Sequence, residues 1–161
     1  MSAEDNKVLI RRFVEEINRG NVDIVDEVFA PDFKEIALWP DPRVPSSMGT
    51  TTGTLAIKEA FPTGRAAFPD GMFTIEELTA EGDIVVLCET FRGTHAGAGF
   101  LDLAPTGKSV HWTSFSILRF AGGKVVEVRS LWDRLGAFQQ LGLLPSQEEL
   151  NPRSHPMPTD H

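Results

Sequence analysis

Apolar residues recur at helical spacing near the start of the chain. Ile10, Val14 and Ile17 fall on one side of such a helix, and charged side chains occupy much of the other. This pattern predicts an amphipathic helix. Ser2, with an acidic residue three positions later, can begin the helix, and Gly20 can end it. We therefore expect a first helix over about the first eighteen residues.

Two more helical segments are expected before the chain changes character. Asp23 can cap a short helix that stops before Pro31, because the residue before a proline disfavours the helical conformation. Residues 40–53 are rich in Pro, Ser, Gly and Thr, which is typical of a loop. A third helix is predicted over 55–68. Pro62 lacks a backbone donor, so we expect this helix to be kinked or broken.

The second half of the chain is typical of strands. Gly82-Asp83 and Gly122-Gly123 are hairpin-type turns, so neighbouring strands should pair antiparallel. Asp133 then caps a last short helix. Helices followed by strands indicate an α+β fold. The predicted strands are 72–78, 84–94, 110–120 and 124–132.

The length of 161 residues suits one domain. We place that domain at residues 1–144. Residues 145–161 contain four prolines among polar residues, and we expect this tail to be extended or disordered.

Composition narrows the classes of partner. The net charge of −8 disfavours a nucleic-acid partner, because phosphates would be repelled. Cys88 is the single cysteine, so no internal disulfide can form and nothing indicates an oxidising compartment. No apolar run reaches the roughly 18 residues of a membrane span, and the first residues lack the apolar core of a signal peptide. We expect a cytoplasmic protein that does not associate with membranes.

Seven short phrases, taken in order, resemble the SnoaL-like polyketide cyclases, also called ester cyclases, of the NTF2-like superfamily. Their order and spacing extend over residues 6–144. They are Asn18-Arg19-Gly20-Asn21, Phe29-Ala30-Pro31-Asp32-Phe33, Phe68-Pro69-Asp70, Gly93-Thr94-His95, Pro105-Thr106-Gly107, Gly123-Lys124-Val125-Val126-Glu127 and Gln140-Leu141-Gly142.

The resemblance implies an NTF2-like cone, in which a curved antiparallel sheet and three N-terminal helices enclose a pocket. It also implies a homodimer formed through the sheet. The reaction of that family is an intramolecular aldol closure of a polyketide ester, without metal or cofactor. An acid on the last strand and a histidine on the preceding strand move the protons.

The catalytic pair of the family is missing here. The position of the acid is Ser130, and that of the histidine is Ser116. A serine hydroxyl does not titrate near neutral pH, so neither residue can act alone as a general base. The resemblance therefore predicts the fold and leaves the reaction open.

The same resemblance orients a set of residues toward the pocket. Strand alternation extends the set along the two strands that carry the serines. The result is an apolar wall with a row of hydroxyls, suited to a hydrophobic small molecule. The expected ligand-binding residues are Trp39, Trp112, Ser114, Ser116, Leu118, Val128, Ser130 and Trp132. The alternative is that the serines are small core residues bonded to backbone.

Two acids could replace the missing base. Glu35 occupies a pocket position of the family, and Glu89 shares the apolar side of its strand with Leu87 and Phe91. A carboxylate in an apolar cavity has a raised pKa, which suits proton transfer. We rank Glu35 above Glu89. The alternatives are a solvated charge at Glu35 and an exposed or ion-paired side chain at Glu89.

Three functions remain open at this point. The first is a cofactor-independent cyclase, isomerase or dehydratase acting on a hydrophobic, polyketide-like substrate. The second is a binding protein for a hydrophobic metabolite, which the two serine replacements favour. The third is a hydrolase on the same fold, which requires acids flanking a water. No metal-ligand spacing is present, and His95 is as well suited to anchoring a loop as to lining a pocket mouth.

Overall fold

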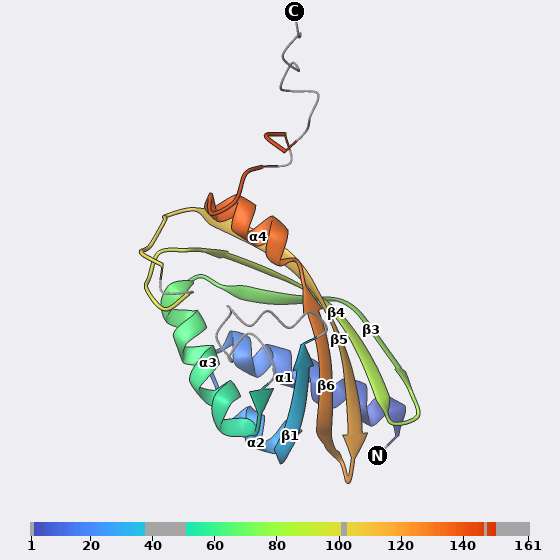
Figure 1. Ribbon diagram of the computed structural model, residues 1–161. Coiled ribbons are helices and arrows are strands. Elements are labelled where there is room, and N and C mark those ends of the chain that lie inside the picture. Colours follow the sequence, from blue (N-terminus) through green and yellow to red (C-terminus); the bar gives the residue numbers. More distant parts are fainter. Residues whose placement is uncertain (1, 38–50, 101–102, 147, 151–161) are drawn as a thin grey trace, which may run out of the picture.

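The structure, a computed structural model, describes residues 2–37, 51–100, 103–146 and 148–150. Its helices and strands are α1 (Ala3–Asn18), α2 (Ile24–Val28), β1 (Phe29–Ala37), β2 (Thr51–Thr52), α3 (Thr54–Ala67), β3 (Met72–Glu81), β4 (Ile84–Thr94), β5 (Ser109–Ala121), β6 (Lys124–Trp132) and α4 (Arg134–Leu141). Among these residues one six-stranded sheet forms, in the order β2-β1-β6-β5-β4-β3. The sheet curves around α1, α2 and α3, and α4 packs at one end of β5 (Figure 1). The α+β class and the three N-terminal helices are confirmed.

The first helix begins as the sequence predicts. The Ser2 hydroxyl accepts a hydrogen bond from the backbone N–H of Asp5 at 3.2 Å, and the Asp5 carboxylate accepts one from the N–H of Ser2 at 2.8 Å. This reciprocal capping box satisfies donors that a helix start leaves unpaired. Ile10, Val14 and Ile17 form the buried face of α1, which packs against the sheet.

The sheet is not wholly antiparallel, which corrects one part of the expectation. Strand β1, which the sequence analysis missed, pairs parallel with β6 and antiparallel with β2. Pro31 and nearby charges hide this strand in the sequence. The ladder between β1 and β6 is irregular between Phe29 and Lys34, and Pro31 falls in that interval, where its missing N–H is tolerated. The parallel pairing places Glu35 opposite Val128 of β6.

Helix α3 continues through Pro62, so of the two outcomes expected at this residue, a kink or a break, the break is wrong. Tertiary contacts hold the last turn in place. The Arg65 guanidinium donates hydrogen bonds to the carbonyls of Ile17 and Asn18 at the end of α1. This contact outweighs the local preference of proline to end a helix.

The buried hydrophobic side chains of the described residues form two clusters. The larger one lies between α1, α2 and the sheet, and includes Val85, Leu118 and Val128. The smaller one contains Phe68, Phe91, Val110 and Leu141, with Trp112 packed against it. The smaller cluster lies toward the end of the sheet that α4 covers, and Phe100 and Trp112, which pack against it, line the cavity described below.

Asn18 provides a test of how α1 is attached to the sheet. Its side-chain amide donates to the carbonyl of Phe73 at 2.8 Å and accepts from the N–H of Phe73 at 2.9 Å. Because β3 is an edge strand, this amide satisfies backbone groups that have no further strand beside them. We expect Asn18→Ala to lower the free energy of unfolding by about 1–3 kcal/mol, measured by urea denaturation.

Asn21→Ala is the matched control. Asn21 is exposed and makes only local hydrogen bonds, to the Glu16 carboxylate and from the N–H of Asp23. Its replacement should cost clearly less, because surface changes are usually small. Equal losses in the two variants would contradict an anchoring role for Asn18.

Candidate functional site

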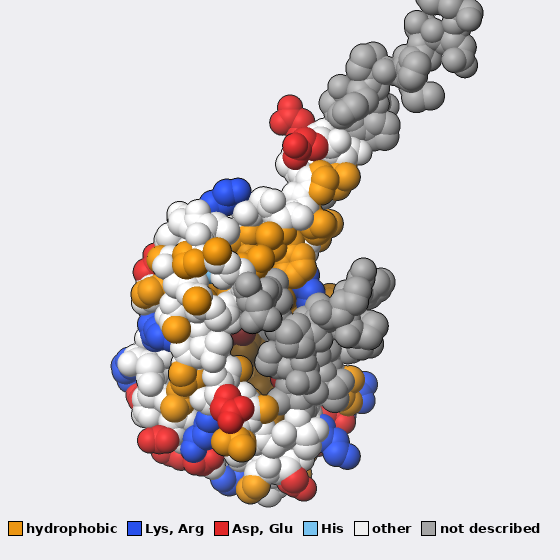
Figure 2. Space-filling view, turned by 60° about the vertical axis from the view of Figure 1, so that its left-hand side comes forward, with side chains coloured by type: hydrophobic (Ala, Val, Ile, Leu, Met, Phe, Trp, Pro, Cys, Tyr) orange, Lys and Arg blue, Asp and Glu red, His pale blue; other side chains and the backbone are white. Residues whose placement is uncertain are grey.

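A cavity of about 690 Å³ lies on the sheet beside α4. Its size is that of a pocket for an organic molecule. The space-filling view shows a hollow with hydrophobic side chains at its bottom (Figure 2). Among the described residues it is lined by Glu35, Glu89, Phe100, Trp112, Thr113, Ser114, Phe115, Ser116, Ser130, Leu131, Trp132, Asp133, Arg134 and Leu135.

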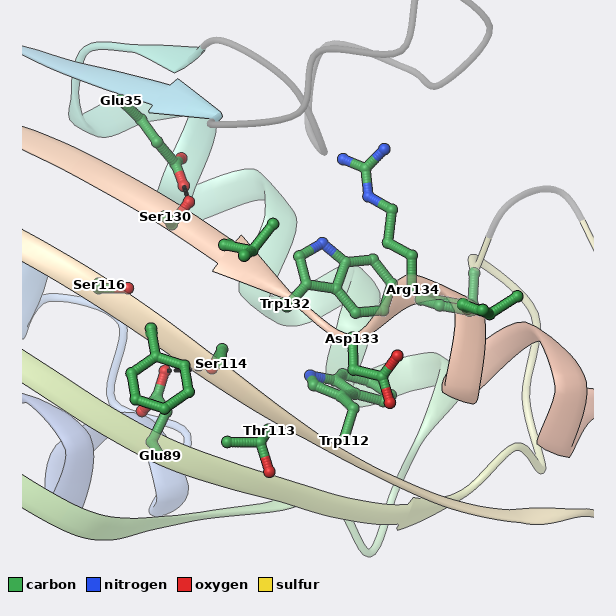
Figure 3. Close-up of a pocket in the computed structure, with 14 residues that line it drawn as sticks. Glu35, Glu89, Trp112, Thr113, Ser114, Ser116, Ser130, Trp132, Asp133 and Arg134 are labelled. Atoms are coloured by element: carbon green, nitrogen blue, oxygen red, sulfur yellow. Dashed lines mark hydrogen bonds between the residues drawn. The ribbon is translucent and has the colours of Figure 1, made fainter. Parts of the chain in front are cut away.

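A polar stripe crosses the sheet within this cavity, and we use that name for Glu89, Ser114, Ser116, Ser130 and Glu35. They come from β4, β5, β6 and β1 (Figure 3). Glu89 pairs across the strands with Ser114, and Ser116 pairs with Ser130. Since alternate residues of a strand share one face, the stripe lies on the same face as the buried core.

Glu89 ends the stripe on β4. The Ser114 hydroxyl donates a hydrogen bond to its carboxylate at 3.3 Å. Burial raises the pKa of Glu89 to about 7, because an apolar surrounding disfavours the charged form, and the Ser114 hydrogen bond opposes this only in part. At neutral pH the carboxyl is therefore poised between its two protonation states.

Glu35 ends the stripe on β1. The hydroxyl of Ser130 donates to its carboxylate at 2.9 Å. Both residues are half-buried. The two carboxylates thus enter the cavity from strands separated by β5 and β6. Glu35 is half-buried and not a solvated surface charge, and Glu89 is neither exposed nor ion-paired with another described residue.

Aromatic rings form the wall next to Glu89. Trp112 stacks on Phe91 with ring centres 4.2 Å apart, and its ring lies 5.2 Å from that of Trp132. Phe100 lies nearly parallel to Trp112 at 6.2 Å. The Arg134 guanidinium lies over the Trp132 ring at 5.6 Å, in the range of a cation–π contact. This wall offers flat apolar surfaces to a planar ligand.

Not every residue expected at the pocket lines this cavity. Trp39 lies outside the described residues. Leu118 and Val128 are buried in the larger hydrophobic cluster instead, below the stripe. Both share the inward face of their strands, but α1 and α2 fill the space above that part of the sheet.

Phe100, Arg134 and Leu135 were missed by the sequence analysis, and Asp133 was expected only as the cap of the last helix. Phe100 belongs to an irregular segment, and the other three lie where β6 joins α4, so periodicity carried no signal for them. Asp133 caps α4 as predicted, because its carboxylate accepts from the N–H of Gly136 at 2.8 Å. Thr113, Phe115 and Leu131 alternate with inward residues, so they border the cavity with backbone while their side chains face the other way.

His95 anchors the loop that carries Phe100. Its Nδ1 accepts a hydrogen bond from the N–H of Thr106 at 3.3 Å, and its carbonyl accepts one from the N–H of Gly107 at 2.9 Å. The fully buried imidazole packs against Phe68, with ring centres 5.3 Å apart. His95 is absent from the cavity lining among the described residues. The geometry agrees with the loop-anchoring alternative.

Two further searches cover only the described residues. In that part of the chain, no group of three His, Cys, Asp or Glu side chains is placed to hold a metal ion. None of the helices there is both long and apolar enough to cross a membrane.

The raised pKa of Glu89 makes a prediction for stability. In the unfolded chain this carboxyl ionises near its ordinary value of 4.5, whereas in the folded protein it ionises near 7. Between pH 4.5 and pH 7 the carboxyl is protonated in the folded protein and ionised in the unfolded chain. The free energy of unfolding therefore falls as the pH rises through this range, by about 3 kcal/mol in total. Glu89→Gln should unfold like the unmodified protein at pH 5 and be more stable by about that amount at pH 8.

Urea denaturation at the two pH values measures this difference. Glu76→Gln, on the exposed side of β3, is the matched control and should leave the pH dependence unchanged. A Glu89→Gln protein that lost stability between pH 5 and pH 8 as steeply as the unmodified one would show that the carboxyl ionises normally.

The chain was also compared with known proteins. The model of the SnoaL-like polyketide cyclase family matches residues 7–141. No curated protein matches the chain.

Solved structures share the fold over most of the chain. AclR from Streptomyces galilaeus, a candidate hydroxylase, is 28% identical with a TM-score of 0.75, covering 89% of this chain and 100% of AclR. A candidate polyketide cyclase from Acidithiobacillus ferrooxidans is 32% identical with a TM-score of 0.70, covering 89% of this chain and 99% of the other. A candidate SnoaL-like cyclase from Jannaschia sp. CCS1, at 23% identity, a TM-score of 0.74 and coverage of 89% and 95%, supports the fold alone. The family model matches most of this chain, and the solved relatives share its fold. The chain therefore belongs to the SnoaL-like polyketide cyclase family.

Proposed function

We propose that the protein is a cofactor-independent acid–base enzyme acting on a hydrophobic, polyketide-like carbonyl compound, as a cyclase, isomerase or dehydratase. One observation carries this proposal. A carboxyl group, Glu89, lies in an apolar cavity, and burial raises its pKa to about 7. A general base works best when its pKa is near the operating pH. Membership of the SnoaL-like family supports the same class of chemistry.

Glu89 is the better candidate base, which reverses the order expected from the sequence. Its carboxyl has a raised pKa and lies beside the aromatic wall, where a planar substrate can stack. Glu35 accepts a hydrogen bond from the Ser130 hydroxyl at 2.9 Å and lies on β1, away from the aromatic wall. We assign Glu35 a second role, as the group that holds Ser130 in place.

The serines at the two family positions have a different task. Ser116 and Ser130 both line the cavity; the Ser130 hydroxyl donates to Glu35, whereas the Ser116 hydroxyl can bind a substrate oxygen. Neither can remove a proton at neutral pH without a base. In this proposal the base has moved from the last strand to β4, on the opposite side of β5.

The main rival is a binding protein for a hydrophobic metabolite. It accounts for the aromatic wall but gives no reason to keep a carboxyl in a place that disfavours its charge. A buried carboxyl of this kind lowers the free energy of unfolding at neutral pH, and such a loss of stability is common at active sites.

The hydrolase alternative needs two acids around one water. Glu35 lies in the same cross-strand row as Val85, three strand spacings away (about 14 Å), and Glu89 is a further four residues, about 13 Å, along β4, so the two carboxylates are too far apart for that arrangement.

We also propose a homodimer formed through the outer face of the sheet. Four large hydrophobic side chains are exposed on this face, and two pairs of them are cross-strand neighbours. They are Val86, Phe115, Ile117 and Leu131. Glu127 and Arg129, which form an ion pair with each other at 2.9 Å, flank them on β6, and a second copy related by a two-fold axis would cover the same apolar patch on both chains.

We further infer a cytoplasmic location, which the single cysteine supports.

Hydrogen exchange on a simple ketone tests the reaction. In deuterated buffer near neutral pH, the protein should accelerate deuterium uptake at the α carbons of 2-tetralone, measured by mass spectrometry. Glu89→Gln should slow this exchange about 100-fold or more, because it keeps the shape and removes the base. Glu35→Gln should slow it much less. Glu76→Gln is the control for the loss of a carboxylate elsewhere.

Two results would contradict the assignment. Exchange that survives in Glu89→Gln but is lost in Glu35→Gln would make Glu35 the base. Binding of 2-tetralone, seen as a change in tryptophan fluorescence, without any catalysed exchange would favour the binding protein.

The oligomer has its own test. Phe115 is 54% exposed, and Phe115→Lys should convert a dimer into monomers because it buries a charge at the proposed contact. Sedimentation velocity at micromolar concentration measures the change. Leu55→Lys, at a still more exposed position on α3, should leave the dimer intact. A monomer in the unmodified protein would contradict the proposal.

A further inference from the structure

The three serines of the polar stripe are not equivalent. The Ser114 hydroxyl donates a hydrogen bond to Glu89, and the Ser130 hydroxyl donates one to Glu35. A hydroxyl has a single proton, so neither serine can donate to a ligand while these bonds hold. Ser116 lies between the two pairs on β5 (Figure 3). Among the described residues its hydroxyl has no hydrogen-bond partner, and it lines the cavity.

We propose that Ser116 is the catalytic hydrogen-bond donor that holds the carbonyl oxygen of the substrate while Glu89 faces the adjacent α carbon. The class of substrate that fits is a planar, ring-containing ketone or ester with an acidic α hydrogen. This inference rests on the proposed function, since it needs Glu89 as the base.

The spacing along β5 supports this arrangement. Ser114 and Ser116 are successive residues on one face, so their side chains are about 6.7 Å apart. Ser114 in turn touches the Glu89 carboxylate at 3.3 Å. A carbonyl group and its α carbon can span this interval, with an O–H···O hydrogen bond of about 2.7 Å at one end and the C–H group directed at Glu89 at the other.

The aromatic wall sets the orientation of the rest of the molecule. Trp112 directly precedes the stripe on the same face of β5, and Trp132 pairs across the strands with Ser114. A ring fused or attached to the carbonyl can lie against these two indoles. Bound in that way, the carbonyl points along β5 toward Ser116, and the carbon between ring and carbonyl lies next to Glu89.

The proton transfer in this arrangement is balanced within the site. The Glu89 carboxylate takes the α hydrogen as a proton, and the electron pair of the broken C–H bond forms the C=C bond of an enolate. The former C=O π pair moves onto the oxygen, whose new charge strengthens the hydrogen bond from Ser116. Return of the proton from neutral Glu89 restores a carbonyl compound, so no further reactant is consumed.

A phenolate imitates the enolate and tests Ser116 directly. The probe is 4-nitrophenol, whose ionised form absorbs visible light and whose protonated form does not. The Glu89→Gln protein is the host, because the neutral amide imitates the protonated base that accompanies the enolate. This protein should bind the phenolate form. Adding Ser116→Ala should weaken that binding at least 10-fold, as expected for a hydrogen bond to a charged oxygen.

Three further variants in the same host complete the experiment. Ser116→Cys keeps the shape of the site and weakens the donor, so it should also lose affinity while the fold is retained. Ser109→Ala, at the far end of β5 and beside Thr94, is the matched control and should bind normally. Ser130→Ala should lose less than Ser116→Ala. An equal or larger loss at Ser130, or no phenolate binding by the host, overturns the inference.

The two proposals fail in different ways. If Glu89→Gln abolishes deuterium exchange but Ser116→Ala leaves phenolate binding unchanged, the base stands and Ser116 is not the donor. If phenolate binding depends on Ser116 but the unmodified protein catalyses no exchange, the cavity binds an oxyanion without turning it over, and the proposed function falls together with the catalytic role of Ser116.

Discussion

The small side chains in the middle of the curved sheet are the constraint from which the cavity follows. On the inner face of β5 and β6, serines occupy positions where the neighbouring rows carry Leu118 and Val128. Leu118 and Val128 are packed by α1 and α2, whereas the serine rows leave space above them that no described side chain fills. Because protein interiors are otherwise close-packed, this space is kept by the size of the residues and by the helices that cover only part of the sheet.

Helix α4 and the loop that follows His95 are fixed in place at one end of the cavity. Helix α4 is attached to β5 by the Gln140 side chain, whose amide bonds both backbone groups of His111. The loop from His95 is fixed to the end of α3, since the N–H groups of Ala96 and Gly97 donate to the carbonyl of Ala67. A Cβ atom at Gly97 would collide with the Ala66 carbonyl, so glycine is required for this close approach. These contacts place Phe100 and the aromatic wall over the stripe.

Carboxylates of this fold occupy two opposite electrostatic situations. At Glu89, burial dominates and raises the pKa, while the single hydrogen bond from Ser114 compensates little. Elsewhere, hydrogen bonds dominate, as at Asp70, whose pKa is lowered by the backbone and hydroxyl of Thr94. Asp70 thus stabilises a turn as a fixed charge, whereas Glu89 is held where charge is disfavoured. The contrast distinguishes a structural carboxylate from one suited to proton transfer.

Local pattern determined the elements whose signals lie in neighbouring residues. The helical spacing of Ile10, Val14 and Ile17, the cap at Asp133 and the glycine turns between strands are short-range features, and β4 and β6 have the predicted bounds. Strand β1 was not predicted because its pairing partner β6 is about ninety residues away and Pro31 is unfavourable in a strand. Tertiary structure alone decided that α3 continues through Pro62, that Leu118 and Val128 are core, and that Phe100 and Arg134 reach the cavity. The same holds for the base. Sequence marked Glu35 and Glu89 as candidates, but a pKa depends on how much water and which donors surround the carboxyl, and only the packed sheet sets both.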